Sequence, residues 1–252
     1  MLNVLSTEFL KLRRSKMLML SLIASVIPSI VKYLQYVFGE NSHNIGWEWF
    51  LSSAQEIKVF SMVTTVVLIS TFIFSMEYQY NTASYLFTSK VSKFHILIAK
   101  LTCLVCLITL INAVSALSQL LFGIVALKTA LSMNLFISLI KVTLWYAFSY
   151  SLLSVLVSML AVVIKKFTLS SVLVLSYLML VFPFHLKNNA YICPLMTPTL
   201  VAAKLFHSND YIFTNYYKDV TINNTFSAAF LIILAAAALS LSLLYYKNSD
   251  MY

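Results

Sequence analysis

The residues best suited to chemistry lie in one polar stretch, EYQYNTASYLFTSKVSKFHILIAK, which runs from Glu77 to Lys100 between two long apolar segments. The stretch holds one carboxylate, three lysines and five aromatic side chains close together. Charged groups beside exposed aromatic rings are typical of surfaces that bind other proteins. The stretch therefore predicts a docking surface rather than a catalytic centre.

No pattern in the sequence favours catalysis or metal binding. Hydroxyl groups are abundant, but none accompanies a histidine and an acid in a recognisable hydrolase context. Cys103 and Cys106 form a C-x-x-C inside an apolar run, without a second pair of ligands nearby. We interpret them as small apolar residues rather than a metal or redox site. The histidines lack the spacing of metal ligands, so we expect no metal site and no enzymatic activity in this chain.

The elements that position this stretch follow from composition. The 252 residues are 61% hydrophobic and 10% charged, with a mean hydropathy of +0.89. A soluble domain cannot cover so much apolar side chain, whereas a bilayer can. Because a spanning helix needs about 20 mostly apolar residues, we predict an all-α polytopic membrane protein, one transmembrane domain over residues 1–252. Its six spans cover about residues 17–37, 59–76, 101–127, 142–164, 167–184 and 226–246, with Lys165–Lys166 at the turn between the fourth and fifth.

Basic residues orient these spans. With the amino terminus in the cytoplasm, most lysines and arginines of the short segments fall inside, as the positive-inside rule requires. We read the net charge of +9 mainly as this orientation signal and expect no nucleic-acid partner, because no basic soluble face exists. Both termini and the Glu77–Lys100 stretch then lie in the cytoplasm, and residues 185–225 lie outside.

The first 16 residues predict an amphipathic helix at the inner membrane surface. Leu2, Leu5, Phe9 and Leu12 recur at helical spacing, while Glu8 and the basic residues occupy other faces. The helix is either a topology anchor or a surface that also meets a cytoplasmic partner. Its assigned interface residues are Phe9, Lys11, Arg13, Arg14 and Lys16.

Polar residues within the spans are few. Asn112, Ser115 and Gln119, followed by Gly123, share one face of the third span. Small residues from Ala147 to Ala161 form a seam along the fourth, which favours close helix packing over a substrate lining. We expect no buried acid in a span and expect Lys32, Lys58 and Lys141 to extend toward the outer interface. The lack of an intramembrane charge argues against an ion-driven carrier.

Two short helices are predicted outside the spans. In the outer segment, TPTLVAAKLFH begins with Thr197 as a cap and Pro198 at the first helical position, and it is too short to span. We expect an interfacial or re-entrant helix there. In the cytoplasmic stretch, Asn81 and Thr82 can cap a short helix, and Ser92 can cap the third span.

The cytoplasmic stretch resembles the signature of ABC exporter permeases of the type-2 class. That signature has a glutamate ending the second span, a Gly-Thr pair, a short Leu-rich helix, a Pro-x-Ser-Arg/Lys turn and a lysine entering the third span. Asn81 replaces the usual glycine, and Val91 falls where proline is common. The opening EFLKLRRSK is also similar to the family's amino-terminal helix. The matching residues are Glu77, Thr82, Leu86, Ser92, Lys93 and Lys100.

The resemblance implies a permease whose coupling helix, around Tyr80–Lys93, sits in a groove of a separate ABC ATPase. Two ATPase subunits would carry the ATP and magnesium, because this chain has only three glycines and no phosphate-binding loop. Its small size implies pairing with a second permease chain, identical or related, in a bacterial cell membrane. The residues assigned to coupling are Glu77, Tyr80, Asn81, Thr82, Tyr85, Leu86, Phe87, Lys90, Ser92 and Lys93.

The cargo expected from this resemblance is an amphipathic, membrane-active peptide moved out of the cell. The alternatives are an immunity permease, a toxin-binding immunity protein without transport, and an ATP-independent channel or carrier. Methionine and aromatic side chains adapt to varied apolar ligands; the alternative is that these residues face only lipid or neighbouring helices. The predicted substrate path comprises Phe60, Met62, Phe72, Phe74, Met76, Tyr177, Met179, Phe182 and Phe184.

Overall fold

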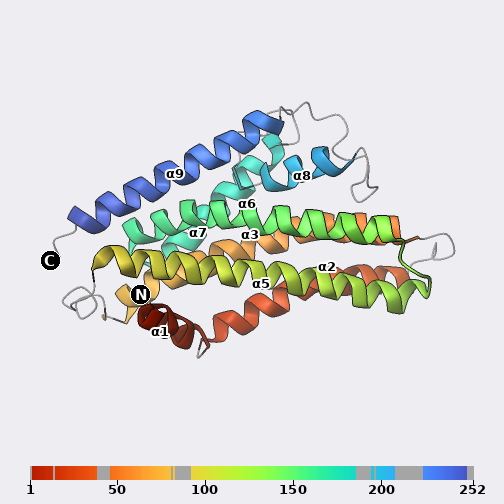
Figure 1. Cartoon of the computed structure of the whole chain (residues 1–252), viewed down its shortest axis with the longest axis horizontal. Coiled ribbons are helices and arrows are strands. Elements are labelled where there is room, and N and C mark those ends of the chain that lie inside the picture. The colour runs from red at the N-terminus through yellow and green to blue at the C-terminus, as the bar shows by residue number, and fades with distance from the viewer. Residues whose placement is uncertain are drawn as a thin grey trace.

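A computed structural model describes residues 2–13, 15–38, 46–80, 82, 92–185, 194–195, 197–207 and 224–248. These residues form helices joined by turns, without a strand. Figure 1 shows long helices side by side, with the start of α1 and the end of α9 at one end of the bundle and the α5–α6 turn at the other. The helices are α1 (Leu2–Arg13), α2 (Lys16–Phe38), α3 (Trp47–Gln79), α5 (Lys93–Leu127), α6 (Met133–Ile164), α7 (Phe167–His185), α8 (Thr197–His207) and α9 (Asn224–Asn248).

The described helices confirm a polytopic helical membrane protein. By length and apolar composition, α2, α3, α5, α6 and α9 can each cross a membrane, and α7 contributes a shorter apolar stretch, Phe167–Leu180. The fifth predicted span, at 167–184, therefore stays a prediction, as does the total of six spans. The turn at Lys165–Lys166 is confirmed, because α6 ends at Ile164 and α7 begins at Phe167.

Three helices are longer than their apolar runs. α3 begins at Trp47, α5 at Lys93 and α6 at Met133, each ahead of the span predicted from hydropathy. Hydropathy detects the part that lies in lipid, whereas helical hydrogen bonding continues into the interface until a cap stops it. Ser92 is such a cap, as predicted, since its side chain accepts a hydrogen bond from the His95 backbone.

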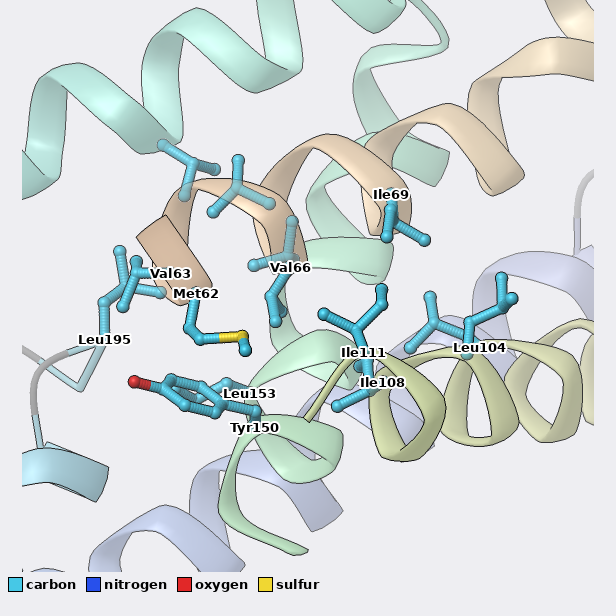
Figure 2. Packing of buried hydrophobic residues seen from close by; sticks show 14 of the residues in the cluster. Met62, Val63, Val66, Ile69, Leu104, Ile108, Ile111, Tyr150, Leu153 and Leu195 are labelled. Atoms are coloured by element: carbon cyan, nitrogen blue, oxygen red, sulfur yellow. The ribbon is translucent and has the colours of Figure 1, made fainter. Parts of the chain in front are cut away.

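The bundle is built around α3, which packs against α2, α5, α6 and α7 and is the most buried of the candidate spans. Figure 2 shows Met62 of α3 beside Tyr150 of α6, and Val63 of α3 beside Leu195, which precedes α8. Lipid tails are as apolar as these side chains, so close packing rather than exclusion from water holds such helices together. α3 is therefore the central helix of the bundle, in contact with helices on several sides.

Small and polar residues allow the close approach of α3 and α5. Asn112, Ser115, Gln119 and Gly123 are all buried, so the predicted common face of this span is confirmed. A Cβ atom added at Gly123 would lie 2.3 Å from Cζ3 of Trp47. Glycine is therefore required at position 123 of α5, where the Trp47 indole packs against the helix backbone.

The short helix predicted at 197–207 is present as α8 and packs against α6 and α9. The Trp145 indole Nε1 donates a hydrogen bond of 2.9 Å to the carbonyl oxygen of Pro198. Thr197, Thr199 and Leu200 are buried. The helix is thus fixed to the bundle, and its side of the membrane remains a prediction.

The expectation that Lys58 extends outward is wrong. Lys58 is 1% exposed, and its Nζ lies 5.3 Å from the centre of the Tyr146 ring of α6. The reason is that α3 continues past Lys58 as a buried helix to Trp47, so this lysine lies within the bundle rather than at a helix end. Lys141, in contrast, is exposed, and Lys32 is half-buried with its Nζ 5.6 Å from the Trp49 ring.

Candidate functional site: a buried ion network

Four charged side chains from three helices meet at the end of the bundle where α1 lies. Glu8 and Lys11 come from α1, Glu77 from α3 and Lys100 from α5. Lys11 Nζ lies 2.6 Å from Glu8 Oε1 and 3.2 Å from Glu77 Oε1. Lys100 Nζ lies 3.2 Å from Glu8 Oε2 and 2.9 Å from Glu77 Oε1. We call these four residues the ion network.

Helix geometry explains how the ion network assembles. Glu8 and Lys11 are three residues apart, so both lie on one side of α1. Glu77 lies in the last turn of α3, and Lys100 lies about two turns into α5. Lys100 also donates a hydrogen bond of 3.2 Å to the carbonyl oxygen of Ile73, one turn before Glu77. This bond fixes the register of α5 against the end of α3.

The ion network is almost fully enclosed. The side chains of Lys100, Glu8 and Glu77 are 0%, 2% and 4% exposed, whereas that of Lys11 is 33% exposed. Two acids and two lysines cancel in formal charge, and each buried charge has an opposite partner. This balance lets charges remain buried, because an unpaired one would cost several kcal/mol or more.

The charges of the network also set the acidity of its α1 members. Burial alone would raise the pKa of the Glu8 carboxyl, but Lys100 and Lys11 outweigh burial and hold the pKa below its ordinary value of 4.5. Burial would lower the pKa of Lys11, yet Glu8 and Glu77 raise it above 10.5. Both side chains therefore stay ionised over the physiological pH range.

The packing of α1 differs from the sequence expectation. Glu8, placed there on a face away from the apolar residues, is buried together with Leu12 against the bundle, whereas Phe9 is 36% exposed. The burial of Glu8 could not be predicted from the sequence, because its partner Lys100 is far away in the chain. The available signal was the Glu8–Lys11 pair, an acid and a lysine three residues apart on an amphipathic helix. Of the other interface residues, Arg13 and Lys16 are exposed, and Arg14 lies outside the described residues.

The predicted coupling residues are described only at the two edges of their segment. Tyr80 is 67% exposed, and the Thr82 backbone donates to the carbonyl oxygen of Glu77 at 2.9 Å. At the other edge, Ser92 is exposed and Lys93 is half-buried. Asn81, Tyr85, Leu86, Phe87 and Lys90 lie outside the described residues. Glu77 directs its carboxylate into the ion network rather than outward.

A pocket of about 470 Å³ opens beside the ion network, between α1 and α3. Lys11 and Tyr80 line it together with two residues predicted for the substrate path, Phe72 and Met76. The pocket thus extends from α1 to Tyr80, at the edge of the predicted coupling segment.

The remaining substrate-path residues are scattered. Met62 and Phe74 are buried in the core, so in this conformation they face neither lipid nor a second chain. Phe60, Tyr177 and Met179 are exposed, and the side chains of Phe182 and Phe184 lie outside the described set. Tyr177 also lines an apolar pocket of about 420 Å³ between α6, α7 and α9. The predicted path is therefore not one continuous surface of this chain.

Comparison with known proteins identifies the fold. The family model of the ABC-2 family transporter protein matches residues 4–181, which include α1, the ion network and the predicted coupling segment. No curated protein matches the sequence. The match covers most of the chain, and it agrees with the helical membrane architecture. This chain therefore belongs to the ABC-2 family of transporter proteins, as a membrane permease that works with an ABC ATPase.

Proposed function

We propose that the chain is the permease subunit of an ATP-driven exporter that moves amphipathic, membrane-active peptides out of a bacterial cell. Two separate ABC ATPase subunits would bind ATP and magnesium, and a second permease chain, identical or related, would complete the transporter. The observation that carries the coupling part of this proposal is the ion network, because it connects α3 and α5, the two helices that flank the segment predicted to dock the ATPase.

The connectivity supports mechanical coupling. Glu77 lies three residues before Tyr80, and Lys100 lies seven residues after Lys93, so members of the ion network lie about one helical turn before segment 80–93 and about two turns after it. A displacement of this segment would move α3 and α5 together. It would also move α1, because Glu8 and Lys11 form ion pairs with residues of these helices. Rigid movement of packed helices is the usual way in which such closures are transmitted.

Docking would rest on the aromatic residues of the segment. Tyr80 already presents 67% of its surface to solvent, and truncation of an interface aromatic commonly costs about 2 kcal/mol or more of binding. We therefore expect Tyr80→Ala, Phe87→Ala and Lys93→Ala to reach the membrane but to lose the ATPase in pulldown or to uncouple hydrolysis from transport. Trp49→Ala is the matched control, because this partly exposed aromatic lies at the opposite end of α3. Full transport by all three test variants would refute the coupling role.

The orientation is tested separately. With both termini in the cytoplasm, a cysteine introduced at Ser92 should resist an impermeant thiol reagent in intact cells, and one at Asn209 should react. Labelling at Ser92 with none at Asn209 would invert the topology and remove the segment from the ATPase.

The peptide cargo is supported by adaptable apolar surfaces. The pocket between α6, α7 and α9 is lined by leucines, Met159 and Tyr177, and methionine and aromatic side chains repack around varied shapes. ATPase stimulation of the complex in nanodiscs, measured with peptides, sugars, lipids and ions, tests this choice. Stimulation by another class with no response to peptides would overturn the cargo. Binding of a toxin without turnover would favour an immunity protein, and flux without ATP would favour a channel or carrier.

A further inference from the structure

A second buried lysine, Lys58, differs from Lys100 in having no counter-ion in the described part of the chain. Its Nζ is buried and makes no hydrogen bond there; its described neighbour is the Tyr146 ring, 5.3 Å away. A desolvated cation–π contact is worth about 2 kcal/mol, whereas burial of an ammonium costs several kcal/mol. The aromatic ring alone therefore does not offset the burial of a charge at this position.

Other buried polar atoms without hydrogen-bond partners lie on α3 and on α5, which packs against it, at about the level of Lys58. Gln55, one turn away on α3, donates to Gln119 of α5 at 3.2 Å, which leaves Gln55 Oε1 and Gln119 Nε2 without partners. Residue numbers fall along α5 as they rise along α3, so Lys58 lies about level with Ser115. Ser115 Oγ and, one turn further, Asn112 Oδ1 are also buried without partners. Buried polar atoms normally have hydrogen-bond partners, so a cluster of buried polar atoms without partners requires an explanation.

The unsatisfied atoms indicate which ligand chemistry the cluster could bind. Hydrogen-bond donors are available from Lys58, Ser115 and Gln119, and the protonated Lys58 is also a cation. Such donors suit a carboxylate. Gln55 and Asn112 offer acceptors, which suit an N–H group. The carboxyl end of a peptide carries both, since only the Cα atom separates its carboxylate from a backbone amide N–H, whereas a fatty acid carries only the carboxylate.

We propose that the cluster of Gln55, Lys58, Asn112, Ser115 and Gln119 is a binding site for the carboxyl terminus of a transported peptide. The site lies between α3 and α5, so a ligand enters when these helices separate, and it is closed in the described conformation. This inference rests on the proposed function for the identity of the cargo, but the unpaired lysine and its polar neighbours stand without it.

The first test compares the thermal stability of variants at the two buried lysines, Lys58 and Lys100. Replacing an unpaired buried ammonium with an apolar residue of similar volume removes a desolvation penalty, so Lys58→Met should raise the thermal stability of the ligand-free permease. Lys100→Met should lower it, because it leaves two acids with one lysine. A loss of stability in Lys58→Met comparable to that in Lys100→Met would show that Lys58 is a structural residue and would overturn the proposal.

Binding gives the second test, with the full chain in nanodiscs and without ATPase. The probes are one fluorescent amphipathic peptide as its C-terminal acid, the same peptide as its C-terminal amide, and dodecanoate as competitor. We expect the acid to bind about tenfold or more tightly than the amide, as charged hydrogen bonds allow, and expect Lys58→Met and Gln119→Leu to abolish this difference.

Each result of the binding test has a distinct meaning. Equal binding of acid and amide, or no binding of either, overturns the site. Competition by dodecanoate as strong as that by the peptide acid overturns the peptide terminus as the ligand in favour of a free fatty acid. Preference for the acid without ATP-driven transport in the complex would keep the site and refute the proposed export.

Discussion

Lys100 is the residue whose replacement should most weaken the end of the bundle that carries the coupling segment. Its Nζ is fully buried and contacts Glu77 at 2.9 Å, Glu8 at 3.2 Å and the carbonyl oxygen of Ile73 at 3.2 Å. Lys100→Met keeps much of the side-chain volume but leaves two buried carboxylates. Lys11, which is one-third exposed, is then their remaining partner within the network.

The size of the effect follows from this geometry. Removing one partner of a buried ion pair costs about 3–5 kcal/mol, and we expect the lower end of that range because Lys11 still compensates part of the charge. About 3 kcal/mol corresponds to roughly a hundredfold shift in the folding equilibrium. Glu8→Gln/Lys100→Met should be more stable than Lys100→Met alone, because it leaves one acid and one lysine.

The measurement is equilibrium unfolding in mixed micelles, with Lys166→Met as the control because Lys166 is exposed in the α6–α7 turn. We expect a large loss of stability for Lys100→Met, partial recovery in the double variant and little change in the control. This expectation would be refuted if Lys100→Met matched the control, or if the losses of Glu8→Gln and Lys100→Met simply added in the double variant.

Two further results are expected from the same preparation. Stability should stay level between about pH 5 and 10 and fall outside this range: the contribution of Glu8, whose pKa lies below 4.5, is lost in acid, and that of Lys11, whose pKa lies above 10.5, is lost in strong base. Glu8→Gln should reduce the loss of stability at acid pH. If the loss of stability below about pH 5 is the same in Glu8→Gln as in wild type, the assignment to Glu8 is wrong. Gly123→Ala should cost about 1–3 kcal/mol by overpacking, since its Cβ would meet Trp47 at 2.3 Å; a melting temperature equal to that of wild type would show that the indole moves aside.

Much of the fold was predictable because lipid imposes a local rule on sequence. Long apolar runs located the candidate spans, and Ser92 and the Lys165–Lys166 pair marked a helix start and a turn. The start of α3 at Trp47 was missed because Glu48 and Glu56 lower the hydropathy of a segment that is nevertheless helical and mostly buried. Helix length beyond the bilayer depends on packing against other helices, which a local pattern does not record.

The candidate site was predictable only in part for the same reason. The family resemblance singled out Glu77 and Lys100, but their contact and the burial of Glu8 depend on how α1, α3 and α5 meet. Lys58 was misread because a lysine beside an apolar run usually reaches the interface. Whether it does so is decided by neighbours such as Tyr146, which is far away in the sequence.

The central claim is that segment 80–93 of this ABC-2 permease docks an ABC ATPase. The most direct measurement places a photo-crosslinking amino acid at Phe87 in living cells and identifies the captured protein by mass spectrometry, with Asn209 as the control position. The claim predicts an ABC ATPase captured from position 87, lost when ATPase expression is repressed, and none from position 209. Capture of the ATPase from position 209, or its absence at position 87 while the transporter is active, would contradict it.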